Sequence, residues 1–321
     1  MTIDKKQLEG LTKKERRELQ REMARIKREA DRKRRKRRKA LGISGLILLI
    51  VAIIAAVGLV VWTQLRLANE GPENMASDGL VLTGDGQAIS AVPSDAHGWL
   101  EPAAAAPAPS EGVVPITIYV DYGSKDAAAF FATNGDQLQQ WATYGLIQLE
   151  IKPIALDQYD SATNNYSTMA ANAAACAANF APTNFLAVNT ALLDANPLVT
   201  NTPIDKAGVS KAVSTALGGE NTDISTCITD DRYANWVATV SQAAANGPLQ
   251  GTDVKLVAHS PLVLVQGEKF TGKMDESSDL LAFISEVLAE DKAEDDKAKD
   301  DGSESSTETP APTPTETEGA K

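Results

Sequence analysis

The chain has 321 residues and a net charge of −12, with two cysteines and two histidines. Its length allows one or two domains, and His and Cys residues do not occur at metal-ligand spacing, so we expect neither a zinc site nor another cofactor. Residues 1–40 contain 18 Lys and Arg against 7 Asp and Glu, which leaves a net charge of −23 on the remainder. The two parts are therefore expected to lie in different surroundings.

The basic arm, residues 1–40, interleaves Lys and Arg with Glu and Asp at spacings that permit i,i+4 pairs, which favours a helix. Binding to nucleic acid is one interpretation of such an arm. We favour a segment that lies on anionic lipid, with no nucleic-acid partner, because of the residues that follow directly.

Residues 41–62 form a run of 22 residues without a charge, long enough as a helix to cross a hydrocarbon layer of about 30 Å. A cleaved signal peptide would have a shorter apolar region and a small-residue cleavage site, so an uncleaved transmembrane signal anchor is predicted. Basic residues crowd its N-terminal side. The prediction is therefore a single-pass protein of the cell membrane with a cytoplasmic N-terminus and residues 70–321 outside.

Residues 63–112 are rich in Pro, Ala, Gly and acidic residues, which indicates a tether. Within the tether, residues 79–83 followed by Gly84-Asp85-Gly86 predict a short strand and a turn. We expect this to be an edge strand of the folded domain.

Residues 114–145 predict a strand, a tight turn and a helix. Apolar residues alternate from Val114 to Val120, whereas beyond Ser124, a candidate N-cap, they recur at intervals of three and four. The helix face is predicted to consist of Ala128, Phe131, Leu138, Trp141 and Ala142.

A second strand is predicted over residues 146–151, ending before Pro153, so that the helix joins two parallel strands. A helical insert follows at about 160–246, with helices expected over 166–180, 182–195, 205–219 and 224–247. The sheet resumes at 262–265, with a turn at Gly267 and a return strand from Phe270. An amphipathic helix capped near Ser277 closes the domain, and the acidic tail, 291–321, is predicted to be disordered.

This order of elements predicts an α/β thioredoxin fold with an inserted helical subdomain, preceded by one transmembrane helix. Four segments carry a more specific resemblance: IYVDYGSKDAAAF, YSTMAANAAACAANF, DRYANWV and SPLVLVQGEKF. Over residues 75–290 the chain resembles the DsbA-like thioredoxin family, in its membrane-anchored actinobacterial form.

The resemblance implies a Cys-Pro-x-Cys motif at the start of the helix, where this chain has Ser124-Lys125-Asp126-Ala127. A thiol at a helix N-terminus is driven towards the thiolate that attacks disulfides. Ser124 cannot form a mixed disulfide and Ala127 cannot resolve one, so we expect no catalytic residue here. Pro261, after Ser260, matches the family's cis-proline beside the active site.

Cys176 and Cys227 both fall in the helical insert. They could form a redox pair of low pKa or a structural disulfide between two helices. The resemblance to related actinobacterial proteins implies the structural disulfide.

Other chemistry near this turn is less well supported. His259 precedes Ser260 and could act as a base for Ser124, but no third group is evident to orient its imidazole, so we interpret it as a packed loop residue. Asp121, Lys125 and Asp126 are expected to form an exposed, solvated polar cluster.

Two functions follow from these expectations. The first is a redox-inactive, chaperone-like binding module of the cell envelope, which holds an unidentified peptide or protein in a groove around Ser124, Ser260 and Pro261 by β-augmentation. The alternative is a thiol-disulfide oxidoreductase of the cell envelope, as the family resemblance implies. A third possibility is that the cytoplasmic arm carries the function and the outer domain acts as a sensor.

Overall fold

The computed structural model describes residues 13–98 and 101–303, which divide into two compact units, one up to Leu65 and one from Arg66 onward. The first unit consists of most of helix α1 (Lys13–Asn69). The basic arm is helical from Lys13, as its charge spacing predicts, and residues 1–12 lie outside the described part.

The predicted span, residues 41–62, lies within α1. Among the residues that the structure describes fully, no helix combines the length and apolar character needed to cross a membrane. The side chains of residues 41–48, which begin the predicted span, lie outside that set.

The second unit is built on a six-stranded sheet of order β2-β1-β4-β3-β5-β6. Strands β3 (Val114–Asp121) and β4 (Ile147–Ile154) are parallel and are joined by helix α2 (Lys125–Thr143), so the predicted β-α-β unit is confirmed. The other neighbours are antiparallel: β1 (Leu80–Gly84) with β2 (Ile89–Ala91) and β4, and β5 (Leu262–Val265) with β3 and β6 (Glu268–Lys269).

The predicted edge strand is present as β1, but it is not at the edge. The chain turns back after Gly84 and adds β2 outside it, which the sequence analysis assigned to the tether. Asp85 makes the turn, because its Oδ1 accepts hydrogen bonds from the backbone N–H groups of Gln87 and Ala88 at 2.9 and 3.0 Å. Part of the predicted tether is therefore part of the sheet.

Strand β4 continues through Pro153, contrary to the prediction that it ends before this residue. The β1 ladder stops at Ile151, so beyond it β4 pairs only with β3. A proline is tolerated where one side of a strand has no ladder to supply with a donor.

Helix α2 buries three of the five residues predicted for its packed face, Phe131, Leu138 and Ala142, whereas Ala128 and Trp141 are half-buried. Ala127 and Phe130 are buried in addition. The polar Asn134 also lies on the buried face, where its amide donates hydrogen bonds to the carbonyl oxygens of Phe130 and Met274. These two bonds allow a polar side chain to replace an apolar one there.

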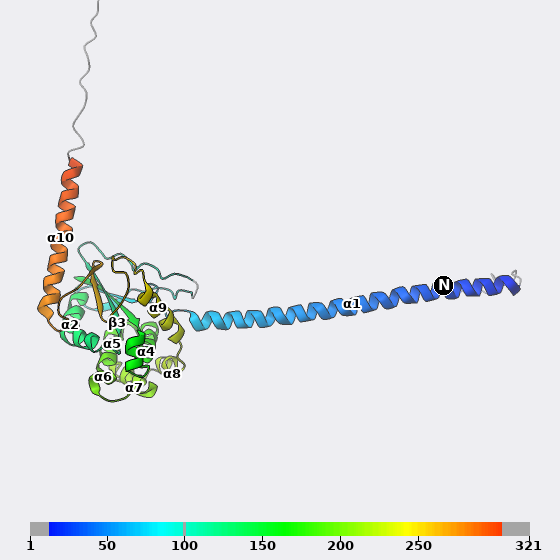
Figure 1. Cartoon of the computed structure of the whole chain (residues 1–321), viewed down its shortest axis with the longest axis horizontal. Coiled ribbons are helices and arrows are strands. Elements are labelled where there is room, and N and C mark those ends of the chain that lie inside the picture. Colours follow the sequence, from blue (N-terminus) through cyan, green and yellow to red (C-terminus); the bar gives the residue numbers. More distant parts are fainter. Residues whose placement is uncertain (1–12, 99–100, 304–321) are drawn as a thin grey trace, which may run out of the picture. The chain divides into compact units, whose positions relative to one another are not determined.

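The helical insert contains more, shorter helices than predicted, and Figure 1 shows α6, α7 and α8 grouped at one end of this unit. Their bounds are α3 Asp157–Ala162, α4 Tyr166–Phe180, the 3-10 turn Pro182–Asn184, α5 Phe185–Asp194, α6 Pro197–Thr200, α7 Lys206–Ala216, α8 Thr222–Thr229 and α9 Ala234–Asn246. The single helix predicted over 224–247 is two helices, because the chain turns at Asp231 with a positive φ of 51°.

Residues Cys176 of α4 and Cys227 of α8 form a disulfide with a Cα–Cα distance of 5.9 Å. The predicted bond between two insert helices is thus present. Both residues belong to the main hydrophobic core, which also contains Phe130, Phe185 and Trp236.

The C-terminal hairpin and helix follow the predicted order. The return strand β6 ends at Lys269, before the predicted Phe270, and Phe270 is buried in the core instead. Helix α10 (Ser277–Ser303) extends into the acidic tail, so residues 291–303 are helical rather than disordered. Lys, Ala and Glu, which have high helix propensity, supply six of these 13 residues and favour the continuation, although another five are Asp, a weaker helix former. Residues 304–321 lie outside the described part.

The double variant Cys176→Ala/Cys227→Ala should unfold more easily than the wild type. The disulfide joins residues 51 positions apart, and in the chain-entropy model closing such a loop lowers the entropy of the unfolded state by an amount worth about 4 kcal/mol. Urea unfolding should show a loss of this order. The exposed Thr226→Ala in α8 is the control, with an expected change within about 0.5 kcal/mol, and an equal effect of both changes would contradict the prediction.

Candidate functional site

The turn between β3 and α2 is closed by the hydroxyl of Ser124. Ser124 is the N-cap of α2, and its Oγ accepts a hydrogen bond from the backbone N–H of Ala127 at 3.2 Å. The same hydroxyl donates to the carbonyl oxygen of Ser260 at 2.5 Å. Ser124 is only 1% exposed, so its hydroxyl is both buried and fully partnered.

Ser260 and Pro261 lie directly against this turn, and their peptide bond is cis. The Ser260 Oγ accepts a hydrogen bond from the backbone N–H of Asp121 at 2.6 Å, and the Ser260 N–H donates to the Tyr159 hydroxyl at 3.4 Å. The carbonyl, the N–H and the side chain of Ser260 therefore all have partners inside the protein. The resemblance places Ser124, Ser260 and Pro261 together, and the structure does so as well.

The buried carboxylate of Asp121 is hydrogen-bonded to the turn and to two neighbouring segments. Its Oδ1 accepts from the Gly123 N–H at 2.8 Å and from the Ser167 hydroxyl at 2.6 Å, and its Oδ2 accepts from the Leu156 N–H at 2.6 Å. Burial raises the pKa of this carboxyl group to about 6, because desolvation outweighs the three hydrogen bonds that favour the charged form. Asp121 thus ties the end of β3 to the loop after β4 and to helix α4.

The expected exposed cluster of Asp121, Lys125 and Asp126 is wrong in one member. Lys125 and Asp126 are exposed, but Asp121 is completely buried. Asp121 is the last residue of β3, a central strand with neighbours on both sides, and its side chain meets Ser167 on α4 rather than solvent.

Gly123 is required by a close approach. A Cβ atom at this position would lie 2.3 Å from the Ser167 Oγ, which is less than any ordinary contact. Ser167 and Tyr159 also belong to this site, although neither is expected there from the sequence. The only available signal for Ser167 was its place in the first turn of a predicted helix, which does not indicate what it faces.

His259 is exposed. The hydrogen bonds of the Ser124 Oγ go to Ala127 and Ser260, so its hydroxyl is directed away from a role as an activated nucleophile. Activation of a serine requires a base within hydrogen-bond reach, and the structure gives Ser124 a carbonyl acceptor instead.

The two cysteines of the chain are in α4 and α8, bonded to each other and 0% and 3% exposed. Thiol-disulfide exchange requires access of a thiolate to a sulfur atom, and burial denies that access. Among residues 13–98 and 101–303, His, Cys, Asp and Glu form no group of three that could hold a metal ion.

A groove of about 640 Å³ lies beside this turn, between α3, α9 and the loop that leads to Ser260. Alanines, a leucine and a valine form part of its wall, and polar residues form the rest. Its lining consists of Ala155, Leu156, Asp157, Gln158, Asp160, Thr168, Ala238, Ser241, Gln242, Ala245, Asn246, Val257 and Ala258.

Residues 110–286 match a family model described as thioredoxin. The match covers more than half of the chain, and the chain therefore belongs to the thioredoxin family.

The chain is also similar to several solved structures of disulfide oxidoreductases. The reduced form of DsbG from Mycobacterium tuberculosis is 18% identical, with 66% of this chain and 88% of that chain covered and a TM-score of 0.48. Reduced DsbA from the same organism is 18% identical, with 66% and 92% covered and a TM-score of 0.48. MdbA, a thiol-disulfide oxidoreductase from Actinomyces oris, is 19% identical, with 54% and 79% covered and a TM-score of 0.43. Comparison with curated proteins gives no significant match.

Replacement of Ser124 by alanine should destabilise the domain by about 2–3 kcal/mol. The change removes the N-cap bond to Ala127 and leaves the buried Ser260 carbonyl without its donor. Lys125→Ala, one residue along and exposed, is the matched control and should stay within about 0.5 kcal/mol. Chemical unfolding of both variants measures the difference, and a Ser124→Ala variant as stable as the control would refute the structural role of the hydroxyl.

Proposed function

We propose that this protein is a redox-inactive member of the thioredoxin family that binds extended polypeptides, as a chaperone-like module of the cell envelope. The observation that carries the proposal is the state of Ser124. At the position where the resemblance implies a reactive cysteine, the chain has a buried hydroxyl bonded to Ala127 and Ser260.

The chemistry of this turn argues against thiol-disulfide exchange. A serine hydroxyl does not ionise at neutral pH as a cysteine at a helix N-terminus does, and Ala127 offers no second sulfur to release a mixed disulfide. The two cysteines that the chain does contain are oxidised and buried. No thiolate is therefore available to exchange with a substrate.

The groove between α3 and α9 is the binding surface we propose, in place of β-augmentation at the residue before Pro261. The carbonyl and N–H of Ser260, which a peptide backbone would need, already bond to Ser124 and Tyr159. Strand β5 is also covered beyond Pro261, because the N–H of Phe270 donates to the Val263 carbonyl oxygen at 2.9 Å. The groove offers an extended chain both apolar contacts and amide partners.

We further propose that residues 41–62 anchor the protein in the cell membrane and that the basic arm contacts anionic lipid on the cytoplasmic side. The uncharged run in the sequence supports this proposal. So does the exposure of large apolar side chains along α1 from Leu49 to Trp62, a helix surface that water solvates poorly.

The alternative function is a thiol-disulfide oxidoreductase of the cell envelope. Membership of the thioredoxin family fits this alternative better than it fits a redox-inactive protein. It requires that the disulfide between Cys176 and Cys227 exchange with substrate, although both sulfur atoms belong to core residues.

Activity and binding assays on the full chain in detergent micelles separate the two functions. In insulin-reduction and peptide-oxidation assays the wild type should not exceed the uncatalysed rate. Turnover by the wild type that disappears in Cys176→Ala/Cys227→Ala would establish the alternative.

Binding is measured separately with a carboxymethylated, unfolded polypeptide that has no free thiol. Ala238→Trp, which places a ring in the groove, should weaken binding at least about fivefold, the factor for ~1 kcal/mol. Thr239→Trp is the matched control, because Thr239 is exposed on the same helix but does not line the groove. Equal binding by both variants would contradict the proposed surface.

Protease treatment of intact cells tests the orientation. A tag fused before Met1 should be protected, and a tag fused after Lys321 should be digested, because the excess of Lys and Arg precedes residues 41–62. Digestion of the N-terminal tag in intact cells would overturn the proposed topology.

A further inference from the structure

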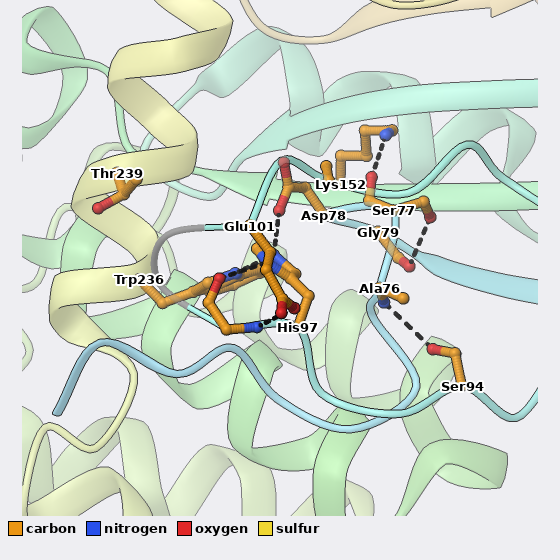
Figure 2. Close-up of polar contacts among 12 residues, drawn as sticks. Ala76, Ser77, Asp78, Gly79, Ser94, His97, Glu101, Lys152, Trp236 and Thr239 are labelled. Atoms are coloured by element: carbon orange, nitrogen blue, oxygen red, sulfur yellow. Dashed lines mark hydrogen bonds and ion pairs between the residues drawn. The ribbon is translucent and has the colours of Figure 1, made fainter. Parts of the chain in front are cut away.

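Outside the turn at Ser124, His97 is a partly buried titratable group whose ring contacts several other residues. It follows β2, and its side chain is 15% exposed. The ring contacts two different parts of the fold, Asp78 in the turn before β1 and Trp236 in the first turn of α9 (Figure 2). The sequence analysis assigned His97 to the tether, so this arrangement was not expected.

Both ring nitrogens of His97 face acceptors. The Nε2 atom lies 2.9 Å from the Asp78 Oδ1, and the Nδ1 atom lies 3.3 Å from the carbonyl oxygen of Gly98. Only the doubly protonated imidazolium donates to both at once. The hydrogen bond to Asp78 raises the pKa of His97, with a smaller contribution from Glu101, and burial opposes it.

The third contact of the ring conflicts with this arrangement. The indole N–H of Trp236 points at the same Nε2 atom at 3.4 Å. An Nε2 atom that carries a proton for Asp78 cannot accept the indole proton, whereas a neutral ring protonated on Nδ1 can accept it. Asp78 and Trp236 therefore compete for one atom. The imidazolium can only donate to Asp78, whereas loss of the Nε2 proton leaves Nε2 as an acceptor for Trp236, with the remaining proton on Nδ1 directed at the Gly98 carbonyl oxygen.

We propose that His97 is a protonation switch that exchanges its Nε2 partner between Asp78 and Trp236. In acid the ring donates to Asp78, so that the loop after β2, which carries His97, is bonded to the turn before β1. At higher pH the ring accepts from Trp236, so that the same loop is bonded to helix α9.

The surroundings of the ring allow such an exchange without rearrangement of the backbone. The Gly71 N–H donates to the His97 carbonyl oxygen at 3.2 Å, which fixes the His97 backbone in either state. The charged groups that act on the ring are Asp78 and Glu101, and α9 contributes the uncharged indole. Lys152 of β4 donates to the Ser77 carbonyl oxygen (Figure 2). It also pairs with Glu150 at 3.1 Å, so its charge has a partner away from the His97 ring.

The switch would act on a wall of the groove. Trp236 lies in the first turn of α9, and Ala238, Ser241 and Gln242 of the same helix line the groove. The hydrogen bond that the switch makes or breaks is therefore at Trp236, two residues before Ala238 in the groove wall. The inference does not depend on the binding function, because the exchange of partners is a property of the three side chains alone.

Histidine and indole NMR signals of the full chain in micelles test the switch. The chain has only two histidines, so His259→Gln leaves the ring signals of His97 alone, and Trp236→Phe identifies the indole N–H of Trp236. His97 should titrate with a midpoint above the ordinary 6.5 of histidine, and the Trp236 indole signal should shift with the same midpoint. Asp78→Asn should lower that midpoint.

A stability measurement gives a second readout. The folded-state pKa of His97 is raised above its unfolded value, so its contribution to stability is present below about pH 6.5 and is lost as pH rises through the folded pKa. His97→Gln should remove this part of the pH dependence. An indole signal that stays constant while His97 titrates, or a midpoint unaffected by Asp78→Asn, would overturn the switch.

Discussion

The hydrogen bond from the Ser124 hydroxyl to the Ser260 carbonyl oxygen is the contact on which the functional end of the domain depends. It joins the start of α2 to the loop that leads into β5, two segments 136 positions apart in the chain. Both segments are bonded in addition to β3, Ser124 through its backbone N–H to the Asp121 carbonyl oxygen and Ser260 through its Oγ to the Asp121 N–H. The turn, the central strand and the cis-proline loop are therefore one rigid unit.

At this position the chain has a hydroxyl that stabilises the fold instead of a thiol that could react with a substrate. A thiolate at the start of a helix is useful only if it is exposed to a substrate, whereas a buried hydroxyl stabilises the fold only if it is fully bonded. The Ser124 hydroxyl is fully bonded, and it is too deeply buried to meet a substrate. The carboxyl group of Asp121 also lies at this turn, and hydrogen bonds from Gly123, Leu156 and Ser167 offset part of its cost of burial. The family's fold is retained here, and the residues at its reactive position have a structural role.

Elements with strong local signals could be predicted from the sequence. The alternation from Val114 to Val120 and the N-cap at Ser124 define β3 and α2, and the resemblance placed Ser260 and Pro261 beside them. What could not be predicted depends on contacts between distant segments. The burial of Asp121, the need for glycine at position 123 and the engagement of His97 all result from packing against α4 or α9. The continuation of β4 through Pro153 depends on where the β1 ladder ends, which no local pattern encodes.

Amide hydrogen exchange at Ala127 tests most directly whether the Ser124 hydroxyl closes the turn. The first N–H groups of a helix have no intrahelical partner and ordinarily exchange rapidly, but that of Ala127 donates to the buried Ser124 Oγ. The Ala127 amide should exchange about 100-fold or more slowly than an exposed amide, which corresponds to a local opening free energy of ~3 kcal/mol. Exchange at Ala127 as fast as at the neighbouring, exposed Asp126 would show that the hydroxyl does not close the turn, and would contradict the account of this site as a structural one.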